Sequence, residues 1–134
     1  MAHLEIEHLT KVYERGKVLA LDDVSLTVDE REFLVLIGLS GSGKSTLLRC
    51  INRLVEPTEG SIVFDGTDIT ALSHRRLRRV RRQIAMIFQQ FNLVKRASVL
   101  NNVLAGRLGY VPTATSLIGT FPKKDIERAQ ANLE

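Results

Sequence analysis

Apolar and polar residues alternate strictly near the start of the 134-residue chain, over residues 4–9. A period of two predicts a strand with one exposed face. Residues 18–21 and 24–28 continue with strand-forming side chains on either side of an Asp22-Asp23 turn signal. We therefore expect the chain to open with an antiparallel layer. Residues 61–64 predict a further strand, which an Asp-Gly turn closes.

Two later runs, residues 33–37 and 84–88, are apolar at every position. Such runs are typical of strands buried on both faces, as in a parallel sheet. Between them, residues 46–54 carry apolar side chains at helical spacing, with Leu47, Ile51 and Leu54 on one face. The residues at 57–60 predict the turn that ends this helix. The order strand, helix, strand predicts an α/β fold.

The last third of the chain has a helical pattern. Ser73 is a suitable N-cap for a helix rich in arginine. Residues 98–108 predict a helix with Val99, Val103 and Leu104 facing inward. A loop over residues 109–122 and a polar helix from residue 123 to the end complete the expected order.

Composition adds little to this picture. Apolar residues make up 44% and charged residues 25% of the chain, which is ordinary for a soluble globular protein. No apolar run approaches the ~20 residues that span a bilayer, and the first residues lack the pattern of a signal peptide. We therefore expect a cytoplasmic protein. The lone Cys50 excludes an internal disulfide and is expected to fill space in the core.

The strongest chemical signal lies between the first apolar run and the helix that follows it. A stretch of nine residues contains the phosphate-binding pattern Gly-x4-Gly-Lys-[Ser/Thr], in the strand–loop–helix context that it requires. Glycine allows the backbone to curl with its N–H groups inward, and the helix N-terminus adds a favourable dipole for anions. The nine residues are Gly38, Leu39, Ser40, Gly41, Ser42, Gly43, Lys44, Ser45 and Thr46. In this pattern Lys44 reaches the β- and γ-phosphates of a nucleotide, and the Ser45 hydroxyl binds Mg2+.

The spacing of other residues around this loop resembles that in the ATPases of ATP-binding-cassette (ABC) transporters. Tyr13, upstream of the loop, resembles the aromatic residue that stacks on the adenine ring of ATP. Gln89, which follows the second apolar run, resembles the glutamine that joins the Mg2+ shell and senses the γ-phosphate. Residues 57–66 resemble the family's proline, glycine, strand and Asp-Gly block. The resemblance implies a P-loop NTPase core with an N-terminal antiparallel layer and an incomplete parallel sheet. It implies ATP and Mg2+ as cofactors.

Residues 92–110 and 121–129 are most similar to the ATP-binding subunits of phosphonate importers. Importers for polar amino acids or other oxyanions are close alternatives. The family resemblance implies a second ATP-binding subunit, transmembrane permease subunits and, indirectly, a substrate-binding protein as partners. It also implies a peripheral location on the cytoplasmic face of the membrane. By this resemblance residues 1–90 are the nucleotide-binding core with its phosphate loop and Q-loop, and residues 91–134 begin the helical subdomain.

These 134 residues resemble only the first half of such a domain. They contain no Leu-Ser-Gly-Gly-Gln signature, no apolar strand ending in Asp-Glu and no switch histidine. Asp65 follows an apolar strand, but Gly66 takes the place of the glutamate, so Asp65 is expected to be structural. No catalytic residue is therefore identified. The alternative hypothesis is a nucleotide-binding fragment that does not catalyse hydrolysis, from a truncated gene or a deliberate truncation.

Six arginines lie within nine residues, at positions 75, 76, 78, 79, 81 and 82. Without them the net charge of +4 would be −2, so the chain has no general basic character. The cluster could bind nucleic acid, but its charges wrap around the helix rather than facing one groove. We favour a solvated helix face and expect no nucleic-acid partner, with Leu77 and Val80 toward the core.

Overall fold

The computed structural model describes residues 2–89, 93–112 and 119–133. By its internal contacts the chain divides into two compact units, Met1–Leu77 and Arg78–Glu134, which are described separately below.

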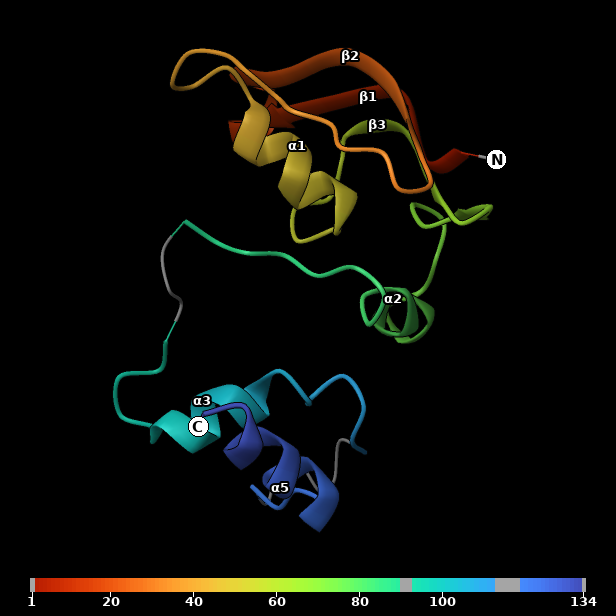
Figure 1. Cartoon of the computed structure of the whole chain (residues 1–134). Coiled ribbons are helices and arrows are strands. Elements are labelled where there is room, and N and C mark those ends of the chain that lie inside the picture. The colour runs from red at the N-terminus through yellow and green to blue at the C-terminus, as the bar shows by residue number, and fades with distance from the viewer. Residues whose placement is uncertain (1, 90–92, 113–118, 134) are drawn as a thin grey trace. The chain divides into compact units, whose positions relative to one another are not determined.

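The first unit is built on a four-stranded antiparallel sheet covered on one face by a helix (Figure 1). The order of the strands is β2-β1-β3-β4. Their bounds are β1 Ala2–Tyr13, β2 Val18–Asp29, β3 Glu59–Phe64 and β4 Thr67–Asp68. A 3-10 turn, η1 (Glu14–Gly16), joins β1 to β2, and helix α1 (Lys44–Ile51) follows the phosphate loop. The antiparallel layer predicted from the alternating pattern is confirmed.

The core of this unit lies between the sheet and α1. Leu47 and Cys50 are the buried residues of α1. The strands of the sheet contribute five more buried apolar side chains, from Ile6, Leu9, Leu21, Ile62 and Phe64. Cys50 is completely buried, and desolvation raises the pKa of its thiol. A thiol that stays neutral is a poor nucleophile, so the expectation that Cys50 fills space in the core is confirmed.

The Asp22-Asp23 turn that the sequence predicts is a bulge instead, because β2 runs without a break from Val18 to Asp29. Asp23 has a φ of 49° and His8, on β1, has a φ of 51°. The register between the two strands shifts between Ile6 and Leu9. His8 donates its N–H to Ser25 Oγ (2.9 Å), and its ring Nδ1 lies 2.6 Å from Asp23 Oδ1. These local contacts satisfy polar groups that the bulge takes out of the ladder.

Helix α1 ends three residues earlier than its apolar pattern predicts. Asn52 is the C-cap, and Arg53 follows in the left-handed region, with a φ of 48°. The Leu54 N–H bonds to Arg49 O and the Arg53 N–H to Cys50 O, both at 2.8 Å, which closes the helix. Leu54 is consequently exposed rather than on the buried face.

Arginine at a position that favours glycine is stabilised by its side chain. The Arg53 guanidinium binds Glu56 through two nitrogens, at 2.8 and 3.0 Å. It also donates to Ile69 O at 2.8 Å and to Leu72 O at 2.7 Å. These four bonds tie the end of α1 to the segment after β4 and offset the backbone strain.

Neither of the two continuously apolar runs is a strand, so this part of the prediction was wrong. Residues 33–37 and 84–88 make no ladder hydrogen bonds, and the side chains of Phe33 and Ile37 are 90% and 92% exposed. Ile87 is 98% exposed. A parallel strand becomes buried only when strands lie beside it and helices cover its faces. Within the described residues, no strand pairs with either run.

The second unit contains short helices (Figure 1). Helix α2 (His74–Val80) begins directly after Ser73, as predicted, and crosses the boundary between the units, with Leu77 buried. Helix α3 (Val99–Ala105) begins at the predicted N-terminus, where Ser98 Oγ accepts a hydrogen bond from the Asn101 N–H. Leu104 is buried as predicted, but Val99 is exposed.

Helix α5 (Lys123–Ala131) corresponds to the predicted C-terminal helix and packs against α3. Arg107, just after α3, donates from Nε to the buried Asp125 Oδ1 at 2.9 Å. This ion pair joins the two helices. The predicted loop before α5 lies partly outside the described residues.

Candidate functional site

The phosphate loop enters α1 through a glycine that no other residue could replace without strain. Gly43, the N-cap of α1, has a φ of 86°. A Cβ at this position would lie 2.4 Å from Ala20 O and 3.1 Å from Leu21 Cδ2 on β2. The loop therefore packs directly on the backbone of β2, and this contact fixes where the N-terminus of α1 lies.

The ammonium group of Lys44 lies inside the loop. Its Nζ donates to Gly38 O at 2.7 Å, to Leu39 O at 2.6 Å and to Ser42 Oγ at 3.1 Å. The side chain thus folds back over the residues that precede it, and positive charge sits at the centre of the curled backbone. This is the position that the sequence pattern predicts for a lysine that meets phosphate oxygens.

Two further features shape the loop as a cradle for an anion. A Cβ on Gly38 would lie 2.7 Å from Ser42 Oγ, so glycine keeps the cradle open. Within the described chain, the backbone N–H groups of Gly43, Lys44 and Ser45 make no hydrogen bond. Unpaired N–H groups at a helix N-terminus, next to a lysine, match the donor set that phosphate groups require. The geometry of the loop therefore fits the polyphosphate of a nucleotide.

The position of Tyr13 relative to the loop contact on β2 follows from the register of the hairpin. Tyr13 ends β1 opposite Val18, which is two residues from Ala20 on β2. Two residues span about 7 Å along a strand, so Tyr13 lies about that far along the hairpin from the loop contact. Lys11 Nζ lies 5.0 Å from the centre of the Tyr13 ring and donates to Glu56 O at 2.7 Å. The sequence pattern did not single out Lys11.

Tyr13 and the loop belong to one unit, and the structure does not relate them to Gln89. Gln89 is exposed and belongs to the second unit. Ser45 is exposed in the first turn of α1. Joint binding of one Mg2+ by these two residues stays a prediction.

Asn102 is a site residue that sequence reasoning missed. Its side chain accepts from the Val94 N–H at 2.8 Å and donates to Val94 O at 3.2 Å and Ser98 O at 3.0 Å. It thereby holds residues 94–98 against α3, where a cavity of about 410 Å3 opens between apolar side chains. The cavity is lined by Leu93, Val94, Ala97, Val99 and Val103, with Lys95 and Asn102. An asparagine in the middle of a predicted helix was the only available signal.

Residues 21–134 match the family model described as ABC transporter. The chain belongs to the ABC transporter family. The resemblance drawn from the phosphate loop and the spacing around it is thereby confirmed. No helix among the described residues of this ABC transporter family member is long and apolar enough to cross a bilayer.

Within the ABC transporter family, the chain is similar to curated proteins that share one name. The phosphonates import ATP-binding protein PhnC of Bacillus thuringiensis subsp. konkukian (strain 97-27) is 53% identical over 131 residues, which are 98% of this chain and 51% of that protein. The protein of the same name from Staphylococcus saprophyticus subsp. saprophyticus is 51% identical over 134 residues, all of this chain and 52% of that protein. This chain therefore spans about half the length of the curated relatives that it matches.

Solved structures of ABC cassettes have the same fold. A dimeric ATP-binding cassette in a post-hydrolysis state, bound to ADP and Pi, matches with a TM-score of 0.78 and 33% identity, over 96% of this chain and 54% of that one. A nucleotide-free cassette from an ABC transporter matches with a TM-score of 0.73 and 30% identity, over 96% of this chain and 51% of that one. The predicted fold class, that of an ABC ATPase, is confirmed.

Proposed function

We propose that this chain forms the nucleotide-binding part of the ATP-binding subunit of an ABC importer for phosphonates. The observation that carries the proposal is the identity of about one half, over nearly the whole chain, with relatives named phosphonates import ATP-binding protein. The phosphate loop supplies the matching chemistry. Under this proposal residues 1–90 form the nucleotide-binding core, residues 91–134 begin the helical subdomain, and the subunit lies on the cytoplasmic face of the membrane.

Each site residue has a proposed role. The backbone N–H groups of Gly43, Lys44 and Ser45 would bind phosphate oxygens, and the Lys44 ammonium would exchange its carbonyl partners for the β- and γ-phosphates. Bound Mg2+ neutralises charge on the phosphates, and the Ser45 hydroxyl and the Gln89 amide oxygen are the proposed ligands. Tyr13 would stack on the adenine, about 7 Å along the hairpin from the loop contact.

We propose the cavity beside Asn102 as the surface that meets a permease subunit. Leu93, Val94 and Val99 around it are 63%, 60% and 67% exposed, which is unusual for a cluster of large apolar side chains. A soluble ATPase that drives transport needs an apolar contact with its membrane partner. Co-purification of the chain with transmembrane subunits would support this part of the proposal, and failure to co-purify would remove it.

We expect the 134-residue chain alone to hydrolyse ATP at a negligible rate. Its sequence contains no apolar strand ending in Asp-Glu, the element that the family resemblance implies for activating the attacking water, and a general base contributes about 100-fold to 10,000-fold. Steady-state release of phosphate should therefore be at least about 100-fold slower than with a full-length ATP-binding subunit. Turnover equal to that of the full-length subunit would contradict the assigned roles.

The proposed function is tested most directly by the adenine contact. Replacing Tyr13 by alanine is expected to weaken binding of a non-hydrolysable ATP analogue about tenfold, because one stacked base contributes about 1–3 kcal/mol. Tyr13→Phe retains the ring and should bind within about twofold of the original chain. Calorimetric titration measures both.

Tripolyphosphate, which has no adenine, is the matched ligand for this test. Its affinity should be the same for the original chain and for Tyr13→Ala. A chain that binds neither ATP analogue nor tripolyphosphate would overturn the proposed function. If Tyr13→Ala lowered the affinity for both ligands equally, the proposal of nucleotide binding would stand, but the stacking role of Tyr13 would be removed.

A further inference from the structure

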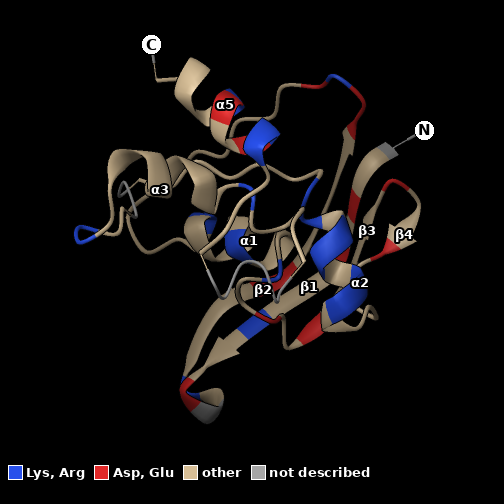
Figure 2. Cartoon of the chain, turned by 90° about the horizontal axis from the view of Figure 1, so that it is seen from below, with Lys and Arg blue, Asp and Glu red and all other residues tan. Residues whose placement is uncertain are grey.

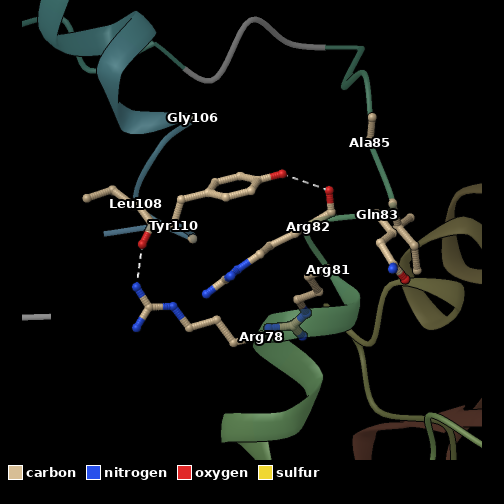
Figure 3. Close-up of a pocket in the computed structure, with 10 residues that line it drawn as sticks. Arg78, Arg81, Arg82, Gln83, Ala85, Gly106, Leu108 and Tyr110 are labelled. Atoms are coloured by element: carbon tan, nitrogen blue, oxygen red, sulfur yellow. Dashed lines mark hydrogen bonds between the residues drawn. The ribbon is translucent and has the colours of Figure 1, made fainter. Parts of the chain in front are cut away.

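The arginine-rich helix leads into a second pocket, which uses no residue of the phosphate loop. Lysine and arginine cover much of α2 (Figure 2). Arg75, Arg76 and Arg79 are exposed, as expected of a solvated face. The half-buried Arg78 and Arg81, with the exposed Arg82, line a cavity of about 660 Å3 within the second unit, opposite Leu108 and Tyr110. We refer to this cavity as the arginine pocket (Figure 3).

The segment that follows α3 holds the Arg78 guanidinium and the backbone of Arg82 in place. Arg78 Nη2 donates to Leu108 O and, at 3.0 Å, to Val111 O. The Tyr110 hydroxyl donates to the backbone carbonyl of Arg82 at 3.1 Å. Figure 3 shows the side chains of Arg78 and Arg82 extending beside one another under the Tyr110 ring. Such positioning reduces the entropy that long side chains lose when they bind a ligand.

Tyr110 also positions Arg82 by stacking. The Arg82 guanidinium carbon lies 5.1 Å from the centre of the Tyr110 ring, and that of Arg107 lies 4.1 Å from it. A guanidinium held against an aromatic face keeps the N–H donors at its edge available in its own plane. Those donors suit the paired oxygens of an oxyanion.

The lining of the arginine pocket contains basic side chains and no acidic ones. Three arginines line it, and no aspartate or glutamate does. The buried Asp125 is engaged by Arg107 at 2.9 Å. In the part of the chain that the structure describes, no carboxylate forms an ion pair with Arg82. A concave, positively charged surface with fixed donors concentrates anions.

We propose that the arginine pocket binds a small organic oxyanion of the phosphonate or phosphate-ester class. The dianionic head group would be bound by Arg82 with Arg78, and its organic part would lie against Ile84 and Leu108. The volume supports an organic ligand, because about 660 Å3 falls within the range of about 300–1,000 Å3 typical of small-molecule sites. This second anion site shares no residue with the phosphate loop, and its ligand would provide the subunit with a means of regulation.

The experiment uses the Lys44→Ala variant of the whole chain, so that the phosphate loop does not compete for the ligand. The sequence contains two tyrosines, so 13C-labelled tyrosine gives two sets of ring signals, and Tyr13→Phe assigns the remaining set to Tyr110. We expect methylphosphonate to shift the Tyr110 signals saturably. Glycerol phosphate and inorganic phosphate are titrated in parallel. Whichever of methylphosphonate and glycerol phosphate binds more tightly identifies the class of the head group.

Arg82→Gln should weaken methylphosphonate binding about tenfold, because it removes a charged bidentate donor. Arg76→Gln removes the same charge from an exposed position on α2, outside the lining of the arginine pocket, and should leave the affinity within about twofold. If Arg82→Gln disturbs the Tyr110 signals before any ligand is added, Arg82→Lys, which keeps the charge but loses the fork, is used and should also weaken binding. Absence of a saturable shift, or equal weakening by Arg76→Gln, would overturn the proposal in favour of diffuse attraction.

Discussion

Replacing Gly60 by alanine is expected to lower the free energy of unfolding by about 3 kcal/mol. Gly60 lies in β3 with a φ of 90°, a conformation that costs an L-residue about 1–2 kcal/mol. A Cβ there would also lie 2.4 Å from His8 O and 2.6 Å from Glu7 O, both on the backbone of β1. Neither strand can move aside without breaking the ladder on which the core of the first unit rests. Urea denaturation followed by circular dichroism measures the change.

The chain contains a matched control for this substitution. Gly66 also has a positive φ, of 69°, but a Cβ there would meet no atom within 4 Å. Gly66→Ala therefore adds the backbone strain without the clash, and the lower entropy of the unfolded chain offsets part of it, so we expect a change within about 1 kcal/mol. Equal destabilisation by the two substitutions would show that the close approach of β3 to β1 contributes nothing.

The same contact explains why the sequence predicted the strands but not their bulges. Alternation over residues 4–9 is a local signal, and so is the Asp-Gly turn after β3; both are confirmed. The bulge at His8 depends on the side chain of Ser25 and the backbone of Gly60, which come from two other strands. No window of sequence around His8 contains that information.

The two apolar runs fail as strand predictions for a different reason. Their composition correctly indicates surfaces that need to be buried, since Phe33, Ile37 and Ile87 are large and almost fully exposed. A strand, however, forms only where its backbone pairs with a neighbouring strand. Among the described residues, no strand pairs with either run. An exposed segment with apolar side chains and an unpaired backbone can pair with another chain. We therefore expect the isolated chain to aggregate readily.

Of the two candidate sites, the phosphate loop could be predicted from the sequence and the arginine pocket could not. The pattern of glycine and lysine spacing was sufficient to predict the loop, because each position acts through its own backbone or through a neighbour a few residues away. The arginine pocket depends on contacts across 30 residues, such as that from Arg78 to Leu108, and on Tyr110. The sequence showed a cluster of charge but not which arginines line a pocket with Leu108 and Tyr110.

Replacing Lys44 by alanine is expected to weaken binding of Mg–ATP analogue and of tripolyphosphate by about 100-fold each, because a charged hydrogen bond to phosphate contributes about 1.5–3 kcal/mol and Lys44 meets two phosphates. The two ligands should respond alike, since Lys44 acts on the phosphates and not on the adenine. Calorimetry on both ligands therefore separates this role from that of Tyr13, whose loss should affect only the analogue.

Two further variants decide whether the shape of the lysine or only its charge matters. Lys124→Ala removes the same charge from an exposed position on α5 and should leave both affinities within about twofold. Lys44→Arg keeps the charge, but a planar guanidinium does not fit the compact site between Gly38 O and Leu39 O, which Nζ occupies at 2.7 and 2.6 Å. We expect Lys44→Arg to resemble Lys44→Ala more closely than the original chain. Full binding by Lys44→Arg would mean that the loop attracts phosphate by charge alone, and the cradle formed by Gly38 and Gly43 would then have no role in selecting the ligand.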